Sequence, residues 1–276
     1  MGLVFSKQSG AIGYLTMGRQ SYDSDAQSFL IAAGITDITQ QTATNDLVTD
    51  LKGYNIWTKM KAIYPVIGGT ATSHKFNLKD PRDLDAAFRI TFIGGWTHSS
   101  MGIVPNGSNT IADTNLIPTS SLTSGDTHFA IYNRTNATPA IAMGMFTAFG
   151  LPDNRWILQD FSTTMYSDHY QYAGNRLTVG ISDYRGLWVS SRVSNTHTIY
   201  RNGSVSNSQS TTPAGFSALT ETVYIQAMNP IGNINLPQYA SGVVPFASIG
   251  TGLTNTDVSN LYTAVQKFQT TLGRQV

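Results

Sequence analysis

The sequence predicts a mainly β protein: an antiparallel sandwich with short N-terminal helices and a C-terminal helix. Three observations support this fold class. Short apolar runs alternate with turn clusters from about residue 54 to residue 248, a spacing typical of sandwiches. Ser, Thr, Asn and Gly are abundant while charged residues make up 12% of the chain, which suits a turn-rich β surface. Glu221 stands beside fifteen aspartates as the only glutamate, and aspartate favours caps and turns over helix interiors.

The chain of 276 residues suits one large β domain with additions, since sandwiches run to roughly 250 residues as single domains. Residues 1–22 show little periodicity and predict an extended arm, which could serve as an attachment segment. Residues 23–53 predict a short helical pair, at residues 23–33 and 39–52, each followed by a glycine. Residues 54–276 are expected to form the sandwich and the helix that closes it.

Two apolar runs between Tyr54 and Ser100 end in glycine pairs, one at Gly68-Gly69 and one after residues 88–93. Pro65 lies in the first run, and proline lacks a backbone donor, so this strand is expected at a sheet edge or a bulge. Further strands are expected at residues 128–132, 141–149, 155–161, 177–182, 187–193 and 223–228.

The clearest turn signal is Asn202-Gly203, between strand-like residues 198–201 and 204–205. Asn-Gly accepts the positive φ angles of a type I′ turn, so a hairpin is expected here. Residues 254–272 predict a helix with one apolar stripe. We expect this stripe to pack on its own domain. The residues that form it are Val258, Leu261, Tyr262, Val265, Phe268 and Leu272.

Three segments have residue patterns more specific than the composition alone would produce. They are residues 21–41 (SYDSDAQSFLIAAGITDITQQ), residues 54–100, and residues 245–276 (PFASIGTGLTNTDVSNLYTAVQKFQTTLGRQV). With them the chain resembles virion structural proteins of tailed bacteriophages of Bacteroidetes, in which short helices accompany a concanavalin A-like lectin/glucanase jelly roll. The pattern of residues 198–205, two strands joined by Asn-Gly, also resembles laminin G-like domains. The resemblance implies a concanavalin A-like antiparallel jelly-roll sandwich and does not imply an activity.

Charge and composition exclude several function classes. The net charge is +1 without a cluster of Lys and Arg, so a nucleic-acid partner is not expected. Cysteine is absent, which removes disulfides and thiolate chemistry. Lys7, Gln8 and several glycines interrupt the first twenty residues, so we expect neither a signal peptide nor a membrane partner.

A glucanase-like fold raises the possibility of polysaccharide hydrolysis, which in retaining enzymes needs two carboxylates about 5 to 5.5 Å apart. The resemblance implies a strand motif with two glutamates, and Glu221 cannot supply both. A pair of aspartates remains possible, for instance Asp160 with Asp168, but nothing in the spacing of these two selects them over ordinary turn aspartates. The five histidines lie far apart without a zinc spacing. The expectation is therefore no enzyme and no catalytic or metal-binding residue.

Calcium is the one cofactor that stays open, because relatives of the fold often bind it near a sheet rim. Hard cations take oxygen ligands, and such residues stand in loop-like contexts without calcium-binding periodicity. The prediction is no cofactor, with calcium as the alternative. The candidate ligands are Asp113, Asn115, Asp126, Asp153 and Asn154.

Sugar binding needs an aromatic face for the apolar side of a pyranose, and amides and hydroxyls for its hydroxyl groups. The chain is rich in both kinds of group. The candidate glycan-binding residues are Trp96, Trp156, Trp188, Tyr170, Tyr172, Asn154, Asp168 and Asn175.

The sequence thus favours a non-enzymatic phage virion protein, a head fibre, decoration or tail component that displays a glycan-binding or adhesion domain. Its expected partners are other virion proteins, further copies of itself and a host surface glycan, and its expected location is the virion, assembled in the host cytoplasm. One alternative is a secreted or cell-surface carbohydrate-binding module. The other is a polysaccharide hydrolase, which the single glutamate disfavours.

Overall fold

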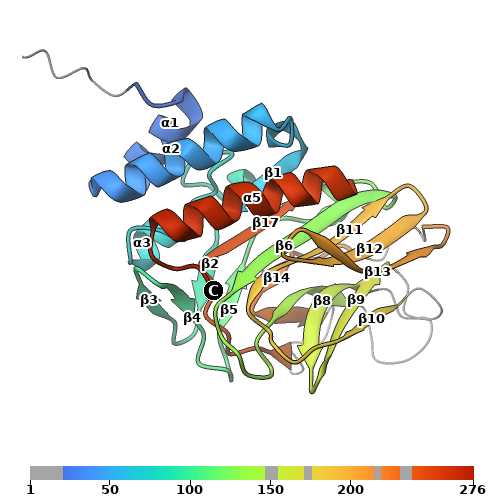
Figure 1. Ribbon diagram of the computed structural model, residues 1–276. Coiled ribbons are helices and arrows are strands. Elements are labelled where there is room, and N and C mark those ends of the chain that lie inside the picture. The colour runs from blue at the N-terminus through green and yellow to red at the C-terminus, as the bar shows by residue number, and fades with distance from the viewer. Residues whose placement is uncertain (1–20, 147–154, 171–175, 214, 216–218, 231–237) are drawn as a thin grey trace, which may run out of the picture.

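The computed structural model describes residues 21–146, 155–170, 176–213, 215, 219–230 and 238–276. Two β-sheets pack face to face, and helices cover the outer face of one of them (Figure 1). The predicted fold class, a mainly β antiparallel sandwich with N-terminal helices and a C-terminal helix, is confirmed. Within the described residues, no helix is both long and apolar enough to cross a membrane.

The first sheet has six strands, and all neighbouring strands are antiparallel. Strand β1 lies at its edge, and Pro65 directly follows it, as the sequence predicts. In spatial order the strands are β1 (Met60–Tyr64), β17 (Phe246–Gly250), β6 (Asp126–Asn133), β11 (Gly186–Val193), β12 (Thr196–Arg201) and β13 (Ser204–Ser210).

The second sheet has nine strands. Its main path runs β10 (Leu177–Gly180), β9 (Thr164–His169), β8 (Arg155–Phe161), β7 (Ala142–Phe146), β14 (Tyr224–Ile225), β5 (Ile111–Asp113) and β2 (Thr91–Ile93). Strand β15 (Ala227–Pro230) pairs in parallel with β7 and also binds β16 (Gln238–Tyr239). A separate ribbon joins β3 (Thr97–Ser99) and β4 (Gly102–Val104).

Large apolar side chains from both sheets fill the space between them. Trp156 of β8 stacks on Phe129 of β6 with ring centroids 3.9 Å apart. Both side chains are fully buried, and burial of rings of this size is a main source of stability. This contact fixes the separation of the two sheets near their centre.

Three long helices cover the outer face of the six-stranded sheet (Figure 1). They are α1 (Ser24–Ala32), α2 (Ile38–Gly53) and α5 (Asn255–Thr271). The N-terminal caps are Asp23, Asp37 and Thr254, whose side chains accept backbone N–H bonds. The stripe of α5 packs on the sheet of its own domain, as predicted. Short helical turns complete the chain at α3 (Ala71–His74), α4 (Pro118–Ser121), η1 (Trp57–Lys59) and η2 (Asp85–Ala87).

The segment after α5 is tied into the sandwich by a buried arginine. The guanidinium of Arg274 donates to the carbonyl of Val66 at 2.8 Å and to the side-chain carbonyl of Gln269 at 2.9 Å. Longer bonds of 3.3 and 3.4 Å reach the carbonyls of Pro65 and Pro245. Burial lowers the pKa of Arg274 to about 9, so the group is charged at neutral pH. One side chain therefore joins α5 to the ends of β1 and β17.

The Asn202-Gly203 hairpin is present, with φ of 49° and 81° at its two turn residues. The strand expected at residues 177–182 ends at Gly180, and residues 147–149 of the strand expected at 141–149 lie outside the described residues. Two other predicted strands differ more from the structure. The strand expected at residues 88–93 begins only at Thr91, because Phe88 adopts a left-handed conformation with φ of 59°. The strand expected at 223–228 is split into β14 and β15 by Gln226, which has φ of 60°.

Candidate functional site

Three of the predicted sugar-stacking rings lie in the core between the sheets. Trp156, Trp188 and Tyr170 have no exposed surface. The indole N–H of Trp188 donates to the carbonyl of Tyr184 at 3.0 Å, and the hydroxyl of Tyr170 lies 2.6 Å from that of Thr127. None of the three rings has a face that a sugar can reach. The structure therefore corrects their expected role: they hold the core, where large rings gain most from burial.

The other predicted site residues are dispersed. Trp96, beside β3, is half-buried, and its N–H donates to the carbonyls of Ile93 and Ile111 at 3.0 and 3.2 Å. The carboxylate of Asp168 is buried and forms a bidentate pair with Arg176, at 2.5 and 3.0 Å. Asn154, Tyr172 and Asn175 lie outside the described residues. The described members of the set do not line one hollow.

A polar cluster that the sequence did not reveal lies buried between the sheets. The ring centroids of His169 and His197 are 4.2 Å apart. The hydroxyl of Ser190 lies 2.6 Å from Nε2 of His169, 3.2 Å from Nε2 of His197 and 2.5 Å from the hydroxyl of Ser167. Burial, and secondarily the nearby His197, lowers the pKa of His169 well below its usual value. Because all four side chains are fully buried, this cluster is suited to hold the sheets together and not to meet a substrate.

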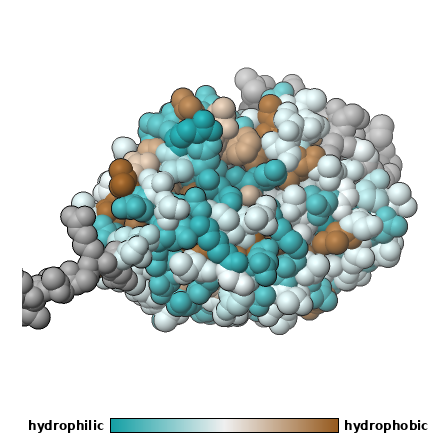
Figure 2. All heavy atoms as spheres, turned by 90° about the horizontal axis from the view of Figure 1, so that it is seen from above, coloured by the Kyte–Doolittle hydropathy of each residue, from teal (hydrophilic) through white to brown (hydrophobic). Residues whose placement is uncertain are grey.

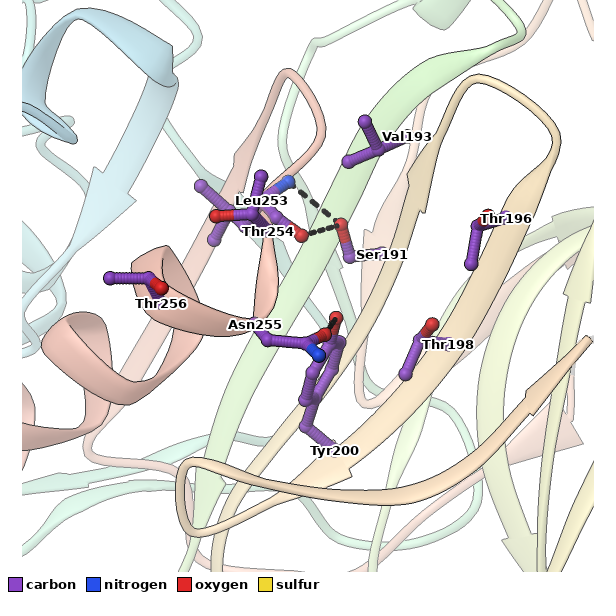
Figure 3. A pocket seen from close by; sticks show the side chains of 9 residues that line it. All are labelled: Ser191, Val193, Thr196, Thr198, Tyr200, Leu253, Thr254, Asn255 and Thr256. Atoms are coloured by element: carbon purple, nitrogen blue, oxygen red, sulfur yellow. Dashed lines mark hydrogen bonds between the residues drawn. The ribbon is translucent and has the colours of Figure 1, made fainter.

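A polar pocket opens where the first turn of α5 meets β11 and β12 (Figure 3). Its volume is about 290 Å³, and we call it the threonine pocket. Hydroxyl and amide groups dominate its lining, and no lining residue carries a formal charge. The lining residues are Ser191, Val193, Thr196, Thr198, Tyr200, Leu253, Thr254, Asn255 and Thr256.

Local hydrogen bonds fix the walls of the threonine pocket. The hydroxyl of Ser191 accepts the N–H of Leu253 at 2.8 Å and donates to its carbonyl at 2.9 Å. The hydroxyl of Tyr200 donates to Oδ1 of Asn255 at 2.8 Å (Figure 3). The side chain of Thr254 caps α5 in a capping box with Asp257. The sheet wall and the helix wall are therefore held in a fixed relation.

Some polar groups of the threonine pocket are not used by the fold. Thr196, Asn255 and Thr256 are exposed. Within the described part of the chain, the hydroxyls of Thr196 and Thr256 and the amide nitrogen of Asn255 make no hydrogen bond to protein. The pocket can thus offer a bound molecule both donors and acceptors.

A second hollow, of about 300 Å³, lies against β7, β8 and β16, and we call it the Phe161 hollow. Phe161 is 70% exposed, and Tyr239 and Gln159 are half-buried beside it. This hollow has the aromatic faces that the threonine pocket lacks, since Tyr200 is only 2% exposed. No signal in the sequence distinguishes Phe161 from a buried phenylalanine, because its exposure depends on its place at the end of β8.

The two aspartates considered for catalysis make hydrogen bonds and an ion pair within the protein. Oδ1 of Asp160 accepts the N–H groups of Ala140 and Ile141 at 2.8 and 2.5 Å. Burial raises the pKa of Asp160 although these bonds oppose the rise. Asp168 is neutralised by Arg176. Glu221 is exposed.

The candidate calcium ligands also make structural bonds. Asp113 accepts the N–H of Asn115 at 2.8 Å, and Asp126 accepts the N–H of Gly252 at 2.8 Å. Asp153 and Asn154 lie outside the described residues. Among the described residues, no group of three or more His, Asp or Glu side chains is placed to hold a metal ion. The prediction of no cofactor, with calcium as the alternative, stays a prediction.

Comparison with known proteins identifies the fold but not a family. No protein-family model matches the chain, and no curated protein sequence matches it. The structure is similar to a mutant sialidase of Trypanosoma rangeli that displays trans-sialidase activity, with a TM-score of 0.53 at 9% sequence identity. The match covers 84% of this chain and 40% of the sialidase. At this identity the likeness shows a shared β-sandwich fold alone.

Two weaker structural matches have TM-scores below 0.5. One is domain 4 of an extracellular arabinanase from Geobacillus stearothermophilus in complex with arabinotriose, at 15% identity and a TM-score of 0.45, covering 74% of this chain and 98% of that domain. The other is the CBM40 module of a Ruminococcus gnavus sialidase, at 11% identity and a TM-score of 0.41, covering 60% and 91%.

Proposed function

We propose that this protein is a non-enzymatic glycan-binding module and that it binds a sugar residue in the threonine pocket. The observation that carries the proposal is the set of hydroxyl and amide groups around one hollow, several of them without a partner within the described residues. Sugars present alternating donors and acceptors without charge, which matches this lining. At about 290 Å³ the pocket lies near the lower end of ligand-site volumes, so we assign it one terminal sugar residue.

The contacts within the pocket indicate how a sugar would be held. Because Tyr200 occupies Oδ1 of Asn255, the amide nitrogen is left to donate to a sugar oxygen. The hydroxyls of Thr196 and Thr256 can each donate and accept. Val193, 36% exposed at the rim, offers an apolar contact to the C–H face of the ring. With a few hydrogen bonds of about 1 kcal/mol each, a single site is expected to bind weakly.

The Phe161 hollow is the rival location for the same function, because its aromatic faces suit pyranose stacking. A screen on a glycan array, followed by titration calorimetry with the best glycan, tests the function and its location together. Thr196→Val and Thr256→Val should each weaken binding about five-fold, the equivalent of one hydrogen bond of about 1 kcal/mol. Phe161→Ala should leave the affinity unchanged.

The outcomes separate the alternatives. If Phe161→Ala abolishes binding while both threonine variants bind normally, the sugar occupies the Phe161 hollow. If no glycan binds the folded protein at millimolar concentration, the proposed function is wrong. Thermal unfolding of each variant serves as the control, since the two substituted hydroxyls make no hydrogen bond to the described protein.

We further propose that the module has no hydrolytic activity, supported by the structural bonds of Asp160 and Asp168. Reducing-end assays on a panel of polysaccharides should show no turnover. Activity that disappears in Asp160→Asn or Asp168→Asn would contradict this.

The more specific proposal, a virion head or tail component that adheres to a host surface, is supported by the sequence resemblance alone. Electron microscopy of particles with the labelled protein would locate it on a head or a tail. Label found only on free protein would refute the virion role and favour a secreted or cell-surface module.

A further inference from the structure

A largely apolar groove lies against helix α1 and the turn that follows it. The groove has a volume of about 370 Å³ and is lined in part by Tyr22, Leu30, Ile31 and Ile35. Ile31 is 74% exposed, whereas Ala26 and Phe29 on the other side of the helix are buried. The fold therefore already uses the face of α1 that carries Ala26, Phe29 and Leu30, and the described residues leave most of the Ile31 side chain uncovered.

The surroundings of the groove are polar. Figure 2 looks onto this helical side, which is mostly hydrophilic with a few separate hydrophobic areas. An exposed isoleucine at a concave site is typical of a contact surface, while single apolar residues on flat surfaces need no explanation.

The chain itself contains a segment whose composition fits the groove. Residues 1–20 precede the described part, which begins at Ser21, next to the groove residue Tyr22. This segment is more apolar than terminal arms usually are, and its only charged side chains are Lys7 and Arg19. Its apolar residues are Met1, Leu3, Val4, Phe5, Ala11, Ile12, Tyr14, Leu15 and Met17.

Charge complementarity favours the same pairing. Residues 21–53, which form the helical pair, contain five aspartates and one lysine, a net charge of −4. Lys267 of α5 pairs with Asp46 and Asp50 of this set, which leaves a net charge of −3. Residues 1–20 contain one lysine and one arginine, a net charge of +2. Opposite charges of this kind steer an encounter and suppress wrong partners.

We propose that residues 3–15 of one copy bind in the α1 groove of a neighbouring copy, so that the protein self-associates through its arms. The six residues from Thr16 to Ser21 can span roughly 20 Å when extended, which allows an arm to leave its own groove. Since every copy holds both an arm and a groove, exchange between two copies is self-complementary. The inference does not depend on glycan binding.

Complementation between two deficient variants tests the proposal. The variant lacking residues 2–20 has a groove and no arm, while Ile31→Lys has an arm and a groove blocked by a positive charge. Each should be monomeric alone in light scattering coupled to size exclusion, at a concentration where the full chain self-associates. Mixed together, they should form a 1:1 complex that weakens as salt rises.

Leu84→Lys is the matched control, because Leu84 is a 51% exposed apolar residue outside the groove. It should associate like the unmodified chain, and circular dichroism should show all variants folded. A full chain that is monomeric at 200 µM overturns the proposal and indicates that the arm binds its own groove or none. Unchanged self-association of Ile31→Lys also overturns it and assigns the contact to another surface.

Discussion

Acidification should destabilise this protein from pH 6.5 downward, because three buried histidines resist protonation. Burial lowers the pKa of His128 to about 4 and that of His74 to about 3, and holds that of His169 well below 6.5. In the unfolded chain these groups protonate near 6.5, so the unfolded state binds more protons as the pH falls. The free energy of unfolding must then decrease with falling pH.

The structure sets the size of the effect. Each pH unit below 6.5 costs about 1.4 kcal/mol for each histidine that stays neutral in the fold. Between pH 6.5 and 5 the loss is therefore about 2 kcal/mol per histidine and about 4 kcal/mol for His128 and His74 together. His169 adds to the loss in the same direction. Burial raises the pKa of Asp113 and Asp160, so these carboxyls take up protons first in the folded state and oppose the loss.

Urea unfolding followed by tryptophan fluorescence at pH 7.5, 6.5, 6.0, 5.5 and 5.0 measures this slope. His128 is suited to a variant because Nδ1 donates to the carbonyl of Thr251 at 2.6 Å and the ring is fully buried. His128→Gln should lower the pH slope by about 1.4 kcal/mol per unit, whatever its effect on absolute stability. A free energy that is constant between pH 6.5 and 5, or an identical slope in the variant, would refute the reasoning.

Three further substitutions follow from the geometry. Gly203→Val should lower the melting temperature, because Gly203 has φ of 81° and a Cβ there would lie 3.1 Å from the side chain of Tyr262; unchanged melting would contradict it. Arg274→Met should lower the free energy of unfolding, measured by chemical denaturation, by about 3 kcal/mol, the value of two charged hydrogen bonds. A loss below 1 kcal/mol would show that the bonds to Val66 and Gln269 are dispensable. Ser190→Ala should lower the free energy of unfolding by about 1 to 3 kcal/mol, because it leaves a buried hydrogen-bond partner such as His169 unsatisfied. It should not alter glycan binding. A loss of binding without a loss of stability would assign the buried cluster a functional role.

Local signals predicted the elements that local rules determine. The helix of residues 254–272 has a cap and an apolar stripe, and the hairpin at Asn202-Gly203 has its own turn chemistry, so both were found. Strand β17 was missed because residues 246–250 include alanine, serine and glycine in a fully buried run without alternation. Such a strand is recognisable only from its two neighbours in the sheet.

The candidate site was harder to predict, since exposure is a property of the assembled layers. A tryptophan such as Trp156 has the same sequence signal in a core as on a binding surface. In the structure it is fully buried in the core between the sheets. The threonine pocket joins residues about 60 positions apart, such as Thr196 and Thr256, with no motif to link them. The polar character proposed for the site was inferable from composition, while the location of the pocket depends on the packing of α5 on the sheet.

The position of β17 has a consequence for biosynthesis. This strand lies between β1 and β6, pairing Ala247 with both Tyr64 and Ile131, so a ribosome makes both neighbours long before the strand that joins them. Until residues 246–250 emerge, β1 and β6 present open edges that can pair with other chains. Contacts of such long sequence separation also slow folding. The nascent chain is therefore expected to depend on protection from aggregation during synthesis. It cannot complete its first sheet before residues 246–250 have been made.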